Sequence, residues 1–178
     1  LLDVVVGASV LVVGWWMDVA WVRAVLPGQE SMKANTAVGL LLLGVALLPW
    51  SRRRRVRPVA AGLLLALATV TLVQFAAGLD LGIDQLLATD PSDSGSGPGR
   101  MSLSTAISFV LVSASVLVLP AERGPGIERR ATLGQLLAFA AALIALMNLM
   151  AYVFGAVSEP GVAPTTQMAL HTALGLLA

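Results

Sequence analysis

A short motif of a methionine, two variable residues, a polar residue, a threonine and an alanine occurs three times in this chain. Its copies begin at Met32, Met101 and Met168, which are 69 and 67 residues apart, so the spacing predicts three tandem units. If the fold brings the copies to one depth, their polar side chains could surround a small molecule, and three helix N-termini there would favour an anion or a carbonyl group. The candidate ligand-binding residues in the motifs are Asn35, Thr36, Ser104, Thr105, His171 and Thr172.

Helix capping is a second interpretation of the same residues. Each motif opens an apolar run, and Asn, Ser and Thr side chains satisfy free N–H groups at helix starts. Capping therefore explains most of the motif's composition without any ligand. It does not explain the third copy, which carries the chain's only histidine, His171. The sequence leaves both interpretations open.

Metal and cofactor binding depend on His171, because the chain has no cysteine and no second histidine. These counts exclude a bis-histidine haem and thiolate metal sites within this sequence. We predict no cofactor and no metal; a haem held by His171 and one of the three motif methionines is the alternative. The phosphate-binding glycine loop, the HExxH motif and the nucleophile elbow are all absent, so these residues are not expected to form an enzyme.

The elements that would position these residues are predicted to be membrane helices. The chain is 57% hydrophobic and only 12% charged, against about 25% charged in soluble domains. A membrane span needs about 20 apolar residues, so five runs are predicted to cross and a sixth is expected to be cut off at Ala178. The apolar runs cover 1–25, 36–50, 59–79, 103–119, 132–157 and the residues from 168 onward.

The predicted fold class is all-α: a polytopic membrane bundle of six transmembrane helices, built as three tandem helical hairpins around a pseudo-threefold axis. Residues 1–178 would form a single transmembrane domain with repeat units of about 1–50, 58–120 and 131–178. The second helix of each hairpin is rich in small residues, which permit close helix approach in lipid. We therefore expect these helices inside the bundle and the Leu/Val-rich helices outside it.

Charge placement predicts the orientation of the bundle. Eight of the eleven basic residues lie in loops 51–57 and 121–130, which the positive-inside rule makes cytoplasmic. The opposite connections are mainly acidic, so all three motifs are predicted at the outer face of a bacterial inner membrane. Residues 80–87 have apolar positions compatible with a short amphipathic helix at that outer interface.

One strongly polar residue is singled out in each first helix of a hairpin, namely Asp18, Gln74 or Asn148. Polar groups at membrane depth are costly and usually face the bundle or a cavity. A carboxylate at Asp18 must be paired, protonated or hydrated, and Arg23 is five residues away, off the same-face helical spacing. Asp18 therefore joins the candidate ligand-binding residues.

An ordered set of segments covers essentially the whole chain and includes, besides the motifs, 78–86 (GLDLGIDQL), 98–101 (PGRM) and 152–155 (YVFG). Together with the three motifs, the set resembles the multi-pass N-terminal membrane region of bacterial signalling proteins. In that family, similar segments precede PAS domains, histidine kinase cores, or diguanylate cyclase and phosphodiesterase domains. The second motif departs from the Asn-Thr-Ala form by carrying Ser104.

The resemblance implies a sensory input or membrane-anchoring domain for signal transduction. An outer-face or intramembrane stimulus would pass through the last helix to a cytoplasmic output domain, through which the protein would form a homodimer. The expected partners are the lipid bilayer and an unknown small-molecule ligand, with no nucleic acid. The alternatives are a structural membrane subunit or anchor without a ligand, and a small carrier, since internal repeats are typical of carriers.

Overall fold

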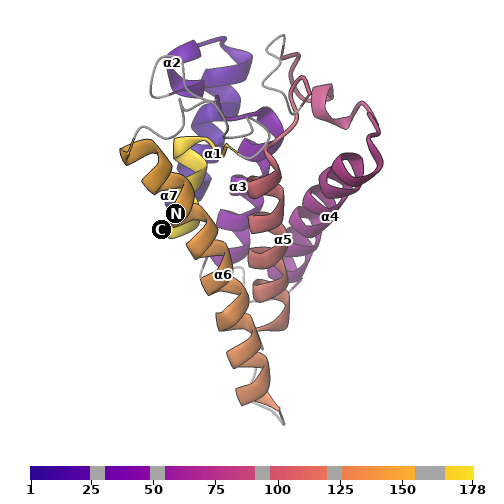
Figure 1. Ribbon diagram of the computed structural model, residues 1–178, viewed down its shortest axis with the longest axis vertical. Coiled ribbons are helices and arrows are strands. Elements are labelled where there is room, and N and C mark those ends of the chain that lie inside the picture. Colours follow the sequence, from indigo (N-terminus) through magenta and orange to yellow (C-terminus); the bar gives the residue numbers. More distant parts are fainter. Residues whose placement is uncertain (25–30, 49–54, 91–96, 120–125, 155–166) are drawn as a thin grey trace.

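The computed structural model describes residues 1–24, 31–48, 55–90, 97–119, 126–154 and 167–178. Within these residues the chain is helical and contains no strand (Figure 1), which confirms the predicted all-α class. The elements in chain order are α1 (Leu2–Ser9), the π-helical segment η1 (Val10–Trp16), α2 (Ala20–Arg23), α3 (Ala34–Leu47), α4 (Val56–Ala77), the 3₁₀ turn η3 (Ile83–Gln85), α5 (Leu103–Val118), α6 (Ile127–Val153) and α7 (Leu170–Leu177).

The three motifs adopt the same local conformation. In each copy the residue after the methionine is an extended N-cap, with ψ of 153° at Lys33, 155° at Ser102 and 143° at Ala169. The three motif methionines are fully buried. The helices that follow, α3, α5 and α7, begin at the same end of the bundle, which we call the motif end (Figure 1).

Burial separates inner from outer helices as the small-residue pattern predicts. Most residues of α3 are buried, whereas the 27 residues of α6 include only Gly134, Ala141 and Ala145 as buried positions. The small residues permit close contacts between neighbouring helices: a Cβ on Gly39 of α3 would lie 2.8 Å from Cζ of Phe109 in α5. The inner position of α3 and α5 is thereby confirmed.

Substituting Gly39 with alanine is expected to destabilise the bundle by about 1–3 kcal/mol, because the Phe109 ring must move away from the new methyl group. Thermal unfolding of the purified protein in detergent micelles measures the change. Gly62→Ala in α4 is the matched control, since nothing lies within 4 Å of its Cβ position and helix propensity favours alanine by about 1 kcal/mol. Equal stabilities of the two variants would contradict the α3–α5 packing.

Proline placement shortens two of the predicted spans. Leu48 and Leu119 each precede a proline and have ψ of 139° and 118°, because the proline ring disfavours the helical conformation of the residue before it. The helices α3 and α5 therefore have 14 and 16 residues. Among the described helices, α4 with 22 residues and α6 with 27 are long and apolar enough to cross a membrane.

The first predicted span is broken near the motif end, which corrects the expectation of one helix over 1–25. The helix stops at Trp16, and Asp18 adopts a left-handed conformation with φ of 56° before α2 begins at Ala20. Aspartate tolerates this conformation better than most residues because its short polar side chain can form a local hydrogen bond.

The two basic loops predicted to be cytoplasmic fall largely outside the described residues, which omit 49–54 and 120–125.

Candidate ligand-binding site at the motif end

The polar residues of the motifs are not the N-caps of their helices. The caps are Lys33, Ser102 and Ala169, and among them Ser102 alone accepts a backbone hydrogen bond through its side chain, from Thr105 N at 3.3 Å. Capping is therefore the wrong explanation for Asn35 and His171, which lie in the first turns of α3 and α7. Their side chains have other surroundings.

Asn35 belongs to a buried polar cluster assembled from four segments. Its Nδ2 donates to Asp84 Oδ1 at 2.9 Å, while Gln74 Nε2 and Arg100 Nε donate to Asp84 Oδ2 at 3.1 and 2.9 Å. The Asp84 side chain is only 3% exposed. We call Asn35, Gln74, Asp84 and Arg100 the motif-end polar cluster. Because a buried carboxylate needs charge-assisted donors, these contacts fix α3, the end of α4 and the start of motif two against one another.

Residues 80–87 do not form the short amphipathic helix with which their apolar positions are compatible. The segment forms only the 3₁₀ turn η3, its leucines at 81, 86 and 87 are exposed, and Asp84 points inward. Two glycines permit this path. Gly78 ends α4 with φ of 62°, and a Cβ on Gly99 would lie 2.5 Å from the Asp84 carbonyl oxygen. The chain can therefore turn inward to reach the three donors.

A buried ion pair lies beside this cluster. Lys33 Nζ is 2.8 Å from Asp90 Oδ2, and the two side chains are 5% and 6% exposed. The main chain of Asp90 is held by Gln85, whose Oε1 accepts from Asp90 N at 2.8 Å and whose Nε2 donates to Asp90 O at 3.2 Å. Since Lys33 is the N-cap of α3 and Gln85 follows Asp84, the ion pair connects α3 to the motif-end polar cluster.

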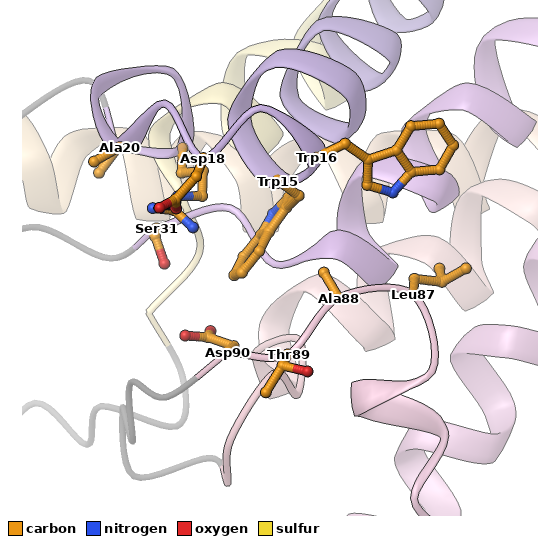
Figure 2. A pocket seen from close by; sticks show the side chains of 11 residues that line it. Trp15, Trp16, Asp18, Ala20, Ser31, Leu87, Ala88, Thr89 and Asp90 are labelled. Atoms are coloured by element: carbon orange, nitrogen blue, oxygen red, sulfur yellow. The ribbon is translucent and has the colours of Figure 1, made fainter.

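An open cavity of about 660 Å³ borders this ion pair, between η1, α2 and residues 87–90. Figure 2 shows Asp18 and Ser31 on one side, Thr89 and Asp90 on the other, and the Trp15 ring between them. Trp15 Nε1 donates to Met32 O at 3.0 Å, and the Arg23 guanidinium lies 4.8 Å from the ring centroid. The cavity therefore offers an aromatic face, charged groups and a hydroxyl.

The structure distributes the predicted site residues over several places rather than one pocket. Asp18 lines the 660 Å³ cavity, where it is exposed and ion-paired with Arg23 at 2.8 Å. The five-residue spacing of this pair does not suit a continuous helix, but the helix breaks at Asp18 and the two side chains can meet.

His171 lines a separate apolar cavity of about 310 Å³ with Val6, Val10 and Trp21. The motif threonines Thr36, Thr105 and Thr172 are all buried, and Ser104 Oγ is 3.3 Å from Ser102 Oγ.

In the third predicted hairpin, the polar residue of the first helix, Asn148, contacts the backbone of the motif. Asn148 Oδ1 accepts from Met168 N at 3.1 Å, and the neighbouring Tyr152 hydroxyl donates to Met168 O at 2.7 Å. Trp15 holds the Met32 carbonyl of the first motif in the same way. In motifs one and three, the backbone of the methionine is therefore hydrogen-bonded to the first helix of the same hairpin.

Residue-by-residue reasoning missed Lys33, Asp84, Asp90 and Arg100 as partners. Two of them lie in segments that carry the family resemblance, 78–86 and 98–101, and charged residues flanking apolar runs were the available signal. In the part of the chain that the structure describes, no three His, Cys, Asp or Glu residues gather as a metal site would require.

The fold and site together define an all-α helical bundle with two membrane-length helices and a polar cluster and cavity at the motif end. Comparison with known proteins adds no family to this description. No family model, curated protein or solved structure matches the chain.

Proposed function

We propose that this chain is the membrane-embedded sensory input domain of a bacterial signal-transduction protein. The six apolar runs identified in the sequence would cross or enter the inner membrane with the motif end facing outward. The last of them, which contains α7, would lead into a cytoplasmic output domain. The family resemblance supports this class of protein. The two membrane-length helices support the location.

One observation carries the proposal: the 660 Å³ cavity shares Asp90 with the buried ion pair to Lys33, the N-cap of α3. A small molecule in the cavity would contact Asp90 and Trp15 directly. Asp90 connects to α3 through Lys33 and to α5 through Gln85, Asp84 and Arg100. A ligand can move helices only by binding two helix arrangements with different affinity. A ligand that contacts Asp90 would compete with Lys33 for this carboxylate and could therefore favour one arrangement over the other.

The path from the cavity to α7 runs through the first helix. Trp15 lies in η1, which continues α1, and α1 packs against both α3 and α7. A shift of the Trp15 wall would therefore be passed along α1 to the helix that we assign to the output. The first helix therefore connects the cavity to α7.

Filling the cavity tests the proposal without knowledge of the ligand. The chain would be fused after Ala178 to a diguanylate cyclase domain and produced in bacterial membranes. Thr89→Trp places an indole at the cavity wall and should change cyclase activity several-fold by mimicking an occupant. Leu86→Trp is the matched control: the residue is 77% exposed and does not line the cavity, so its activity should equal that of the parent fusion.

Equal activity of the two tryptophan variants, with both proteins folded and inserted, would favour the structural-anchor alternative. Cyclase activity in the cytoplasm also requires α7 to end on that side of the membrane. A fusion whose cyclase domain lies on the outer side of the membrane would overturn the predicted orientation. Substrate flux in proteoliposomes, independent of any output domain, would favour the carrier alternative.

A further inference from the structure

A second polar site lies away from the motif-end cluster, where α1 meets α7. Asp3 of α1 is 5% exposed and Thr172 of α7 is fully buried. Asp3 Oδ1 and Thr172 Oγ1 both lack a hydrogen-bond partner among the described residues. A buried acceptor or hydroxyl without a partner is costly, and a carboxylate without a partner is more costly still.

Glycines bring the Asp3 carboxyl group against the backbone of its neighbours. A Cβ on Gly175 of α7 would lie 2.9 Å from Asp3 Oδ1, and a Cβ on Gly44 of α3 would lie 3.1 Å from Asp3 Cβ. Thr172 precedes Gly175 by three residues, and positions at this spacing are neighbours on a helix surface, with about 5–6 Å between their Cβ atoms. The two unpartnered oxygens therefore belong to residues of α1 and α7, two helices that pack against each other. The chain ends that these two helices carry lie close together in Figure 1.

Few charged or titratable groups face Asp3. The helix α3 and the segment η1 contain none, α7 contributes only His171, and α1 itself adds only the amino group of Leu1. His171 is one helical turn before Gly175 and lines the apolar cavity together with Val6 and Val10. No lysine or arginine side chain is hydrogen-bonded or ion-paired to Asp3 in the described residues. A proton taken up from the aqueous phase would neutralise this carboxyl group.

We propose that Asp3 is a proton-binding site within the α1–α7 contact and that Thr172 supplies a hydrogen bond to its ionised form. The protonated carboxyl group is neutral and fits against the Gly175 backbone. When the proton leaves for the aqueous phase, the carboxylate needs donors, which the Thr172 hydroxyl and entering water provide. The contact between α1 and α7 then opens. Coupling of this step to an output rests on the proposed function, whereas protonation itself does not.

The experiment measures protonation and helix separation on the chain itself in lipid nanodiscs. Because the chain has no cysteine, Val12→Cys and Leu174→Cys, both at exposed positions, carry spin labels that report the distance from η1 to α7. At about pH 6, where exposed carboxyl groups are ionised, we expect a short inter-label distance and the infrared carbonyl band of a protonated carboxyl group. At alkaline pH the band should disappear and a longer distance should be populated.

Substitutions assign these changes to the site. Asp3→Asn imitates the protonated form, so it should hold the short distance at every pH and lack the carboxyl band. Thr172→Val removes the donor to the carboxylate and should move the transition to higher pH by about one unit, a tenfold change in proton affinity. Glu128→Gln, which neutralises an exposed carboxylate on α6, should titrate like the parent.

Two results would overturn the site. The first is a carboxyl band or a distance change that persists unaltered in Asp3→Asn. The second is a short distance restored at alkaline pH by sodium ions in the parent, which would assign the site to a cation instead of a proton. Neither result bears on the cavity, because the cyclase fusion with Thr89→Trp tests that separately.

Discussion

Replacing Arg100 with alanine is expected to lower the free energy of unfolding by about 3–5 kcal/mol, among the largest effects of any single substitution in this chain. Arg100 Nε is 2.9 Å from the buried Asp84 carboxylate, and the other two donors to that carboxylate, Asn35 and Gln74, are neutral amides. Removing the guanidinium leaves a buried negative charge without a cation. Its hydrogen bond to Leu79 O at 3.0 Å is lost as well.

Chemical unfolding in detergent micelles, followed by circular dichroism, measures this loss. Asp84→Asn in the Arg100→Ala background removes the uncompensated charge and should restore part of the stability. Arg130→Ala is the control, since Arg130 is exposed and surface substitutions usually change stability by about 0.5 kcal/mol or less. A loss from Arg100→Ala as small as that of the control would show that water, not the guanidinium, stabilises Asp84.

Replacing Lys33 with methionine is the second large expected effect, again about 3–5 kcal/mol, because Asp90 stays buried after its cation is removed. The double variant Lys33→Met/Asp90→Leu should recover most of the loss. A buried ion pair and a well-packed apolar pair are often similar in stability, so the charges are expected to cost little when both are removed. The hydrogen bonds between Gln85 and the backbone of Asp90 remain in both variants.

A double-mutant cycle on these variants gives the coupling energy of the pair. The matched control is Asp18→Asn, which breaks the ion pair with Arg23 at the exposed side of the same cavity. The Asp18 side chain is 83% exposed, and exposed pairs are worth about 0–1 kcal/mol. If Lys33→Met and Asp18→Asn cost the same, the Lys33–Asp90 pair is not buried in the folded protein.

Local signals predicted the helices well where a residue acts through its immediate neighbours. The motif spacing placed three helix starts that share one conformation, and small residues marked α3 and α5 as inner helices. Helix ends were predicted less well. Apolar composition extends to Trp50 and Leu119, yet α3 and α5 stop before Pro49 and Pro120 because the residue before a proline avoids the helical conformation.

The candidate site was predicted only in part. Asn35 and Asp18 were selected from sequence, but the partners of Asn35 were not, and the left-handed turn that lets Asp18 reach Arg23 has no marker in the apolar run. His171 and Thr172 were grouped with the other motif residues. The structure separates them: His171 lines an apolar cavity, whereas Thr172 is buried and its hydroxyl has no hydrogen-bond partner among the described residues.

The sequence by itself determined that this is an all-α, strongly apolar chain with three equivalent helix starts, because composition and short-range spacing control helix formation. Only the tertiary structure decided which polar residues face one another. Asp84 meets Asn35 across 49 residues and Arg100 across 16, and Asp90 meets Lys33 across 57. Such pairings depend on how helices pack and where glycines let the chain turn, and no local pattern records them. The burial of Asp3 could not be predicted for the same reason, because it depends on Gly44 of α3 and Gly175 of α7, which are distant in sequence.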